Sequence, residues 1–259
     1  MINGPLLMKE VLTLLLSHQP ASELEPVLEL WREFEPTSQI LLVYGGKELA
    51  FAEVAFPKKV FVDDPQLRVR DQQRERQSCA GVFRAAHEWL KSHPEIEYVH
   101  YVEYDQLPLV RDLYDRLVEN IHDEQADVLA YKLQRIDGTS HPHYLYHASD
   151  PRFQQYFASI SVRRETRVVL SMMGTGAFWR REAFDAVAAH REPFPIYTEV
   201  YVPTLAHHLG YRLRDFGAQN KYVTNLGDYT EVIEEFRSEG AWMVHPVKKL
   251  PPSWRSIVR

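Results

Sequence analysis

Short runs of apolar residues recur along this chain, each about as long as one β-strand. The first, residues 11–16, is continuous and stops at the polar segment 17–20, as expected for a strand that is buried on both faces of a sheet. Similar runs follow at 40–44, 59–62, 98–103 and 128–133. Segments with a helical period separate them, at 24–34 with Ser22 placed as its cap, at 82–90 and at 109–124. This alternation predicts an α/β sandwich with a mostly parallel central sheet flanked by helices.

The length of the chain is sufficient for one compact domain. A protein of 259 residues can bury roughly three quarters of the surface of its unfolded chain, which is enough for a core without disulfides or a structural metal. With 45% hydrophobic and 25% charged residues, the chain also falls outside the disordered and fibrous classes. We therefore expect a single domain over residues 1–259.

Charge and cysteine content restrict the partners and the compartment. The 30 basic and 36 acidic residues give a net charge of −6, which offers polyanions no long-range attraction, so we expect no nucleic acid partner. Cys79 is the only cysteine, which excludes an internal disulfide and favours a reducing, cytoplasmic compartment. Lys9 and Glu10 interrupt the N-terminal apolar segment, which argues against a signal peptide. No run reaches the roughly 18 apolar residues of a transmembrane segment, so contact with the inner membrane would be peripheral.

The second half of the chain departs from the regular alternation. Residues 135–166 are rich in His, Tyr, Arg and Ser and have little period, so we expect an irregular, partly mobile insertion beside a site. Beyond it we expect strands at 168–173 and 212–216 and helices at 180–190 and 200–209. The last thirty residues are expected to be a tail laid over the fold.

The most informative stretch is the strand expected at 98–103, which runs into two carboxylates. Glu103 and Asp105 are two positions apart, and residues with this spacing on a strand face the same side. Ligands of open α/β sheets bind beyond the carboxyl ends of the strands, and paired carboxylate oxygens there could hold Mg²⁺ or Mn²⁺ together with phosphate oxygens. The alternative is a turn at the end of a strand that carries solvated acids.

Four motifs, taken in order, resemble those of the GT-A fold glycosyltransferases, and the resemblance extends from the first strand to the C-terminus. The motifs are an acidic one at 103–105, a glycine-bearing loop at 172–184, an acidic one at 197–201 and a C-terminal one at 242–248. The family has Asp at the first acidic position, where this chain has Glu103. The resemblance implies a GT-A type, Rossmann-like sandwich, with a nucleotide-binding half at 1–134 and an acceptor-side half and tail at 135–259.

The same resemblance assigns roles at the chemical centre. Glu103, Asp105 and His245 would hold the metal, Lys248 would meet phosphate, and Glu199 would act as the catalytic base of an inverting enzyme. Gly174, Thr175 and Gly176 would flank the donor sugar, with backbone amides at a helix N-terminus and a threonine hydroxyl as donors. The structural alternatives are a plain turn and cap for the loop, a helix-start carboxylate for Glu199, a core histidine for His245 and a solvated tail for Lys248.

At the nucleotide end, the residues after the first three expected strands are the candidates. Ser17, His18 and Gly45 could hold the base and ribose, and Asp64 follows the third strand. Arg74 and Gln77 precede the helix expected at 82–90, the N-terminal part of which faces the nucleotide in GT-A enzymes. The alternative for this arginine-rich stretch is a solvated face. His141, His143 and His147 form a cluster whose first pair lacks the spacing of a helical metal site, and they are interpreted as an acceptor-facing or solvated loop.

Together these observations predict a metal-dependent glycosyltransferase of polysaccharide or glycolipid biosynthesis. It would use Mn²⁺ or Mg²⁺ and move a sugar from a nucleoside-diphosphate sugar to a glycan, a lipid-linked acceptor or a small acceptor. A nucleotidyltransferase is the first alternative, but residues 17–20 are not the glycine-rich, basic loop that such enzymes carry after their first strand. The second is a catalytically silent relative that binds a nucleotide or a glycan.

Overall fold

The computed structural model describes residues 10–64, 67, 80–216, 228–250 and 254. Two of the predicted nucleotide-binding residues, Arg74 and Gln77, lie outside these ranges, and so does Cys79.

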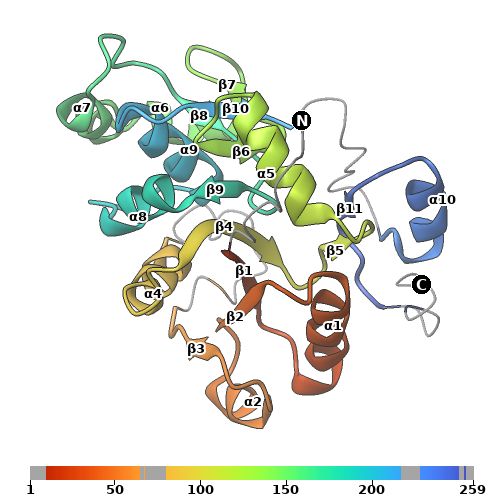
Figure 1. Ribbon diagram of the computed structural model, residues 1–259. Helices are drawn as coiled ribbons and strands as arrows, with labels where there is room; N and C mark the ends of the chain where they lie inside the picture. The colour runs from red at the N-terminus through yellow and green to blue at the C-terminus, as the bar shows by residue number, and fades with distance from the viewer. Residues whose placement is uncertain (1–9, 65–66, 68–79, 217–227, 251–253, 255–259) are drawn as a thin grey trace.

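A seven-stranded sheet forms the centre of the molecule (Figure 1). Its strands are β1 (Glu10–Ser17), β2 (Gln39–Tyr44), β3 (Lys59–Phe61), β4 (Ile96–Glu103), β6 (Val128–Ala130), β9 (Phe178–Arg180) and β10 (Leu213–Asp215). Their order across the sheet is β10, β6, β9, β4, β1, β2, β3. All neighbours pair in parallel except β9, which is antiparallel to both β4 and β6. The predicted α/β class with a mostly parallel central sheet is confirmed.

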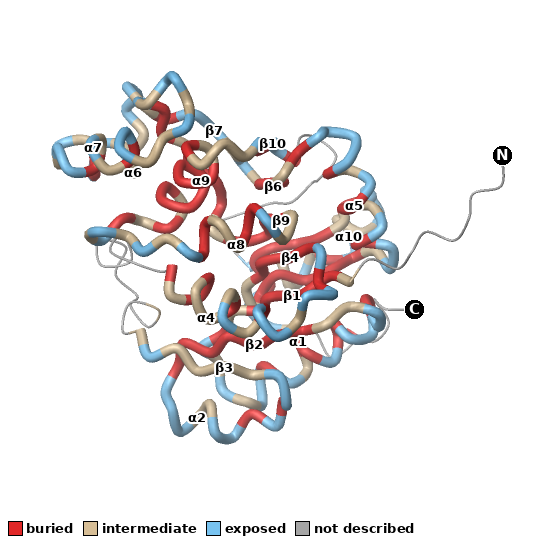
Figure 2. The backbone as a smooth tube through the Cα atoms, turned by 60° about the vertical axis from the view of Figure 1, so that its left-hand side comes forward, coloured by how far each residue is buried: buried red, intermediate tan, exposed pale blue. Residues whose placement is uncertain are grey.

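Side chains of β1 pack alternately on the two faces of the sheet. Val11 and Leu15 belong to the core on one face, while Leu12 and Leu14 belong to the core on the other. Because both faces are covered, the strand needs apolar residues at consecutive positions, which explains the uninterrupted run in the sequence. Figure 2 shows β1 and the neighbouring β4 as buried along most of their length.

Helices cover both faces of this sheet. On one side lie α1 (Ala21–Phe34) and α5 (Leu113–Asp123), and the short α10 (Ile233–Ser238) adds Ile233 to the same core. On the other side lie α4 (Gly81–Leu90), α8 (Arg181–Ala189) and α9 (Thr198–His208), and α7 (Pro151–Ile160) packs against α9 and adds Phe153 and Phe157 to this core. Two shorter helices, α2 (Glu48–Glu53) and α6 (Pro142–Ala148), and one 3-10 turn (Thr230–Val232) complete the described helical segments.

Two small antiparallel pairs of strands lie outside the central sheet. One joins β5 (Leu107–Pro108) to β11 (Met243–Val244), and the other joins β7 (Gln134–Arg135) to β8 (Leu170–Ser171). The strand expected at 168–173 is therefore reduced to the two residues of β8. The strand β11 brings the C-terminal segment into the fold, a point that matters for the site below.

The prediction of an irregular insertion at 135–166 is wrong. The segment contains α6 and α7, and α7 begins with Asp150, whose side chain accepts a hydrogen bond from the Arg152 N–H at 2.9 Å. Phe153 and Phe157, four positions apart, place two buried rings on one face of this helix. Tyr156 and Ile160 are partly buried against the same core, so the helix has a regular apolar spacing in the sequence that the prediction missed.

Two further expectations need correction. Ser22 does not cap the first helix, because α1 already begins at Ala21 and has no side-chain cap. The last thirty residues are not a tail laid over the surface: Met243, Val244 and Val247 are buried in the core that α1 and α5 also line. Met243 and Val244 pair with β5 through backbone hydrogen bonds. The backbone of a loose tail would form its hydrogen bonds with water instead.

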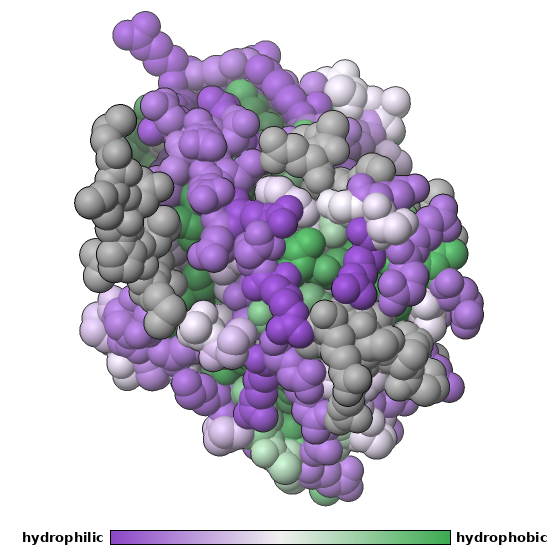
Figure 3. All heavy atoms as spheres, turned by 45° about the vertical axis from the view of Figure 1, so that its right-hand side comes forward, coloured by the Kyte–Doolittle hydropathy of each residue, from purple (hydrophilic) through white to green (hydrophobic). Residues whose placement is uncertain are grey.

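The surface of the molecule is mainly polar in the view of Figure 3, where hydrophobic residues show only in small areas between hydrophilic ones. Among the helices of the described residues, none combines the length and the apolar character that crossing a membrane would require.

Glu35 is a carboxylate buried where α1 ends. Its Oε1 accepts a hydrogen bond from the backbone N–H of Tyr114 at 3.0 Å, at the start of α5, and the residue is 6% exposed. Burial, with a smaller contribution from the charges of Asp115 and Asp112, raises the pKa of Glu35 from 4.5 to about 8. The carboxyl group therefore stays protonated in the folded protein at neutral pH.

We predict that Glu35 makes folding stability fall with rising pH. Below pH 4.5 the group is protonated in both states, but between 4.5 and about 8 it ionises only in the unfolded chain, which then binds fewer protons. Glu35→Gln keeps the acceptor for Tyr114 and removes the titration. The free energy of unfolding of Glu35→Gln minus that of the wild type should therefore increase by more than about 1 kcal/mol between pH 5 and pH 8.

Urea denaturation at pH 5, 6.5 and 8 measures this difference. Glu33→Gln, two positions earlier on the exposed face of the same helix, is the matched control and should follow the wild type. A constant gap between Glu35→Gln and the wild type over this range would contradict the prediction.

Candidate metal centre

The strand β4 ends in a tight turn at the carboxyl edge of the sheet. Tyr104 donates its backbone N–H to the carbonyl of Leu16 in β1 at 3.0 Å, and Gln106 donates its own to the carbonyl of Glu103 at 3.0 Å. The first bond continues the ladder between β1 and β4, and the second closes a turn over residues 103–106 before β5. The turn directs Asp105 inward, so that it is only 1% exposed.

The C-terminal segment meets this turn through β11. Met243 pairs with Pro108 and Val244 with Leu107, and the Val247 N–H donates to the carbonyl of Asp105 at 2.8 Å. His245 lies between these points on the same segment. A ladder of backbone hydrogen bonds thus fixes a histidine against carboxylates about 140 residues earlier in the chain.

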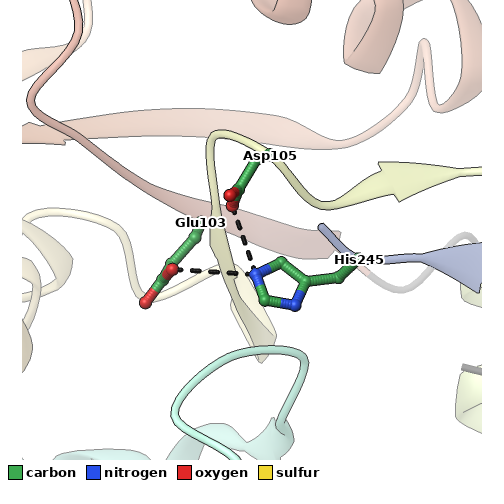
Figure 4. A group of neighbouring side chains, drawn as sticks. All are labelled: Glu103, Asp105 and His245. Atoms are coloured by element: carbon green, nitrogen blue, oxygen red, sulfur yellow. Dashed lines mark ion pairs between the residues drawn. The ribbon is translucent and has the colours of Figure 1, made fainter. Parts of the chain in front are cut away.

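Three side chains converge there, as Figure 4 shows. Glu103, Asp105 and His245 each offer one ligand atom, and these atoms lie within 4.8 Å of one another. The Nε2 atom of His245 lies 3.2 Å from Oδ1 of Asp105 and 3.9 Å from Oε2 of Glu103. The three residues that the sequence suggested as metal ligands are therefore neighbours in space.

Charges near this group set its protonation. Burial opposes ionisation of Asp105, but contacts with His245 and with the Lys248 ammonium, which bonds its Oδ2, outweigh burial and lower the pKa of Asp105. For Glu103, burial and then the nearby charge of Asp105 raise the pKa. The Glu103 side chain is 38% exposed, so it forms the side of the group that a ligand in solution can reach.

The donor set fits a divalent cation. Two carboxylates and one imidazole present oxygen and nitrogen atoms, a mixture that suits Mn²⁺ better than the all-oxygen sites preferred by Ca²⁺ or Mg²⁺. Within the described part of the chain the buried Oδ1 of Asp105 has no hydrogen-bond partner, and it faces an imidazole nitrogen at 3.2 Å. A cation at this point would also offset the repulsion between the two carboxylates.

Thr175 supports the acidic turn from the glycine-bearing loop. Its hydroxyl, 2% exposed, donates to Gln106 Oε1 at 2.6 Å and accepts the backbone N–H of Glu103 at 2.9 Å. The expectation that this hydroxyl donates to a sugar needs correction, because its proton is already used inside the protein. Gln106 is a supporting residue that the sequence analysis missed, although it directly follows the acidic motif.

The two glycines of the loop are also engaged within the protein. Gly174 donates its N–H to Oε1 of Glu199 at 3.0 Å, and Gly176, with φ +86°, donates its own to the carbonyl of Tyr101 at 2.8 Å. The loop leads first into β9 and only then into α8. The expected pair of free amides at a helix N-terminus is therefore absent among these described residues.

Glu199 lies in the first turn of α9, beside this loop. A Cβ added to Gly174 would come within 3.0 Å of Glu199 Oε1, so the loop approaches the carboxylate as closely as it does only because this residue is glycine. Oε2 of Glu199 lies 3.5 Å from Nε2 of His143 in α6. His143, interpreted from sequence as part of a loop, is thus a neighbour of the proposed base, and no one-dimensional pattern signals this contact.

Four predicted nucleotide-binding residues that lie within the described ranges are found along the same edge of the sheet. Ser17 is buried at the end of β1, and its carbonyl accepts the Gly45 N–H at 2.9 Å. A side chain at Gly45 would collide with Leu67, which explains the glycine. His18 is exposed and lies edge-on to Tyr104, with ring centroids 5.5 Å apart. Asp64 follows β3, and its Oδ2 lies next to Gly81 at the start of α4.

Comparisons with known proteins give similarity in structure alone. No protein-family model matches the chain, and no curated protein sequence matches it. A solved mannosyltransferase, PcManGT from Pyrobaculum calidifontis in complex with GDP-Man and Mn²⁺, is similar over 80% of this chain, with 14% identity and a TM-score of 0.43. WbbM, a bifunctional glycosyltransferase solved in its apo form, is similar over 99% of this chain, with 10% identity and a TM-score of 0.46.

The third similar structure is A197 from STIV, with 9% identity and a TM-score of 0.40 over 81% of this chain and 82% of its own. The chain spans about half the length of the two glycosyltransferases, 54% of PcManGT and 50% of WbbM.

We predict that Asp105 is needed for Mn²⁺ to bind. Asp105→Asn keeps the size of the side chain and one oxygen but removes the charge, so the dissociation constant for Mn²⁺ should rise by at least about tenfold, or 1.4 kcal/mol. Electron paramagnetic resonance of free Mn²⁺ during a titration gives this constant directly.

Asp123→Asn is the control, because Asp123 is an exposed carboxylate at the end of α5. It should bind Mn²⁺ as the wild type does. Equal affinities for all three proteins would mean that the group around Asp105 is not the metal site.

Proposed function

We propose that this protein is a metal-dependent glycosyltransferase that moves a sugar from a nucleoside-diphosphate sugar to a glycan, a lipid-linked acceptor or a small acceptor. The observation that carries the proposal is the convergence of Glu103, Asp105 and His245 beside the ammonium of Lys248. Cation ligands next to a lysine suit a ligand whose charge is concentrated on phosphate oxygens. The diphosphate of a nucleotide sugar is such a ligand.

In this proposal Glu103, Asp105 and His245 hold Mn²⁺ or Mg²⁺, which would offset charge on the departing nucleoside diphosphate when bound. Lys248 now pairs with Asp105, and its side chain is 53% exposed. Its four-carbon stem lets the ammonium turn from the carboxylate to a phosphate oxygen without movement of the backbone. Lys248 would then stabilise the charge that develops on the leaving group.

Glu199 would act as the catalytic base of an inverting transfer. Its carboxylate accepts the N–H of Gly174, the neighbour of Thr175, whose hydroxyl accepts the N–H of Glu103; the Glu199 side chain is 21% exposed. It is thus separate from the proposed ligands, close to them and open to a substrate. A carboxylate so placed can take the proton of an acceptor hydroxyl while that hydroxyl attacks the anomeric carbon.

The remaining assignments follow the two halves of the chain. Residues 1–134 would bind the nucleotide, with Ser17, His18 and Gly45 near the base and ribose and with Asp64, Arg74 and Gln77 as further nucleotide-binding residues. Residues 135–259 would supply the acceptor side, and the backbone of the glycine-bearing loop at Gly174 would lie beside the donor sugar. The exposed ring of His18 beside Tyr104 supports a base near this point, because nucleobases stack on aromatic rings.

A thermal-shift screen is the first test of the proposal. Uridine, guanosine, adenosine, cytidine and thymidine diphosphates would each be added with and without Mn²⁺. One of them should raise the melting temperature only when Mn²⁺ is present, because a ligand that binds the folded state stabilises it by mass action. If none does, the proposed function is wrong.

Lys248→Met should have opposite effects on two affinities. Without the ammonium beside Asp105, Mn²⁺ alone should bind as tightly as before or more tightly, since one repulsive charge has gone. The nucleoside diphosphate identified by the screen should bind about tenfold more weakly in the presence of Mn²⁺, because one phosphate partner is lost. Isothermal titration calorimetry measures both constants.

The neighbouring Lys249 provides the control, since it is exposed and the sequence analysis assigns it no role. Lys249→Met should leave both affinities at the wild-type values. Equal losses of diphosphate affinity in the two variants would indicate general attraction by surface charge.

Glu199→Gln should lower kcat by roughly 10² to 10⁴ and leave donor binding almost unchanged. The amide keeps the size and one oxygen that can accept the Gly174 N–H, but it cannot take a proton at neutral pH. Turnover of the donor identified above gives kcat, and NMR of the product gives its anomeric configuration.

Glu182→Gln controls for the removal of a carboxylate from a helix start, because Glu182 lies in the first turn of α8. Both variants should lose no more than about 1 kcal/mol of stability. Near-normal turnover in Glu199→Gln, or a product with retained configuration, would defeat the assignment.

A further inference from the structure

The carboxylate of Glu199 has a nitrogen neighbour at each of its two oxygens. Oε1 accepts the backbone N–H of Gly174 at 3.0 Å, and Oε2 lies 3.5 Å from Nε2 of His143. The side chains of His143 and Glu199 are 23% and 21% exposed, so water competes only in part for this contact. One nitrogen therefore faces each oxygen, and each oxygen keeps room for a further partner.

His143 is itself fixed by its neighbours. Its backbone N–H donates a hydrogen bond at 3.3 Å to Nδ1 of His141, the residue that caps α6. Its ring lies against the ring of Tyr197, with centroids 4.4 Å apart, and Tyr197 directly precedes α9. One turn further along α6, Nε2 of His147 accepts the backbone N–H of Tyr197 at 3.2 Å. Two histidines with i, i+4 spacing thus join α6 to the start of the helix that carries Glu199.

The surroundings of the His143 ring select one tautomer. Nδ1 is buried and has no hydrogen-bond partner among the described residues, whereas Nε2 faces a carboxylate. A neutral imidazole carries one proton. On Nε2 that proton is stabilised by Glu199, and on Nδ1 it would be a buried donor without an acceptor.

We propose that His143 is the positioning residue for Glu199: its Nε2–H holds Oε2, the Gly174 N–H holds Oε1, and together they fix the direction of the carboxylate. This inference rests on the proposed role of Glu199 as the base. A base must meet its proton at hydrogen-bond distance, and a misplacement of about 1 Å can cost on the order of 10²-fold in rate.

Two variants of His143 separate orientation from packing. His143→Phe keeps a ring against Tyr197 but has no N–H, so kcat should fall by about 10- to 100-fold with the donor KM within about twofold of the wild type. His143→Gln restores an N–H at a similar reach and should return kcat to within about threefold of the wild type. Thermal unfolding of both variants checks that each is folded.

A double-mutant cycle tests whether His143 acts through Glu199. In the Glu199→Gln background, His143→Phe should cause less than about a twofold further loss, because the group that it positions can no longer act. A full additional loss in that background, or an unchanged kcat in His143→Phe alone, would overturn the proposal.

Histidine NMR gives a readout that needs no turnover. In ¹⁵N-labelled protein, assigned with His143→Phe, the His143 ring should be the Nε2–H tautomer and should become a mixture in Glu199→Ala. A tautomer that is the same with and without the Glu199 carboxylate would overturn the pairing. If no nucleotide sugar is turned over, the proposed function fails, and this spectrum still decides whether the pair exists.

Discussion

A carboxylate inside a protein needs a compensating charge, and the candidate site is organised around this requirement at Asp105. The residue is 1% exposed, yet contacts with His245 and Lys248 lower its pKa. Both partners come from the C-terminal segment, which the fold can deliver only because β11 pairs with β5. The acidic turn, the small pair of strands and the buried apolar residues of the segment therefore depend on one another, and loss of any one would leave a charge without compensation.

Repetition along the chain made most of the central sheet predictable. The strands β1, β2, β3 and β4 are short apolar runs that end in polar or glycine-containing turns, and the helices α1, α4 and α5 have clear periods. The position of β9 was not predictable in the same way, because Phe178–Arg180 is three residues long and follows a glycine-bearing loop. The helical spacing of Phe153, Tyr156, Phe157 and Ile160 does mark α7 in the sequence, and only the polar composition of the surrounding segment argued against it.

The candidate site, too, was predictable from the sequence only where a local signal exists. The spacing of Glu103 and Asp105 after a strand is a local signal, and it pointed to the group that the structure assembles. His245 came from the resemblance, since a lone histidine carries no local signal of ligation. The inward use of the Thr175 hydroxyl and the contact between His143 and Glu199 depend on packing between distant segments. Such contacts leave no trace in the order of residues, and this is why the loop was expected to face a ligand with free donors.

The reversed strand β9 has a consequence for how a protein of this kind can diversify. Because it is antiparallel to β4, it begins where β4 ends, so the chain that precedes it arrives at the carboxyl edge. That preceding chain includes α6 and α7, which were absent from the expected pattern and pack outside the central sheet. Evolution could lengthen, shorten or replace them without breaking a strand order that β1, β2 and β4 already fix. The segments at this edge and the order of the strands could therefore change independently within one chain.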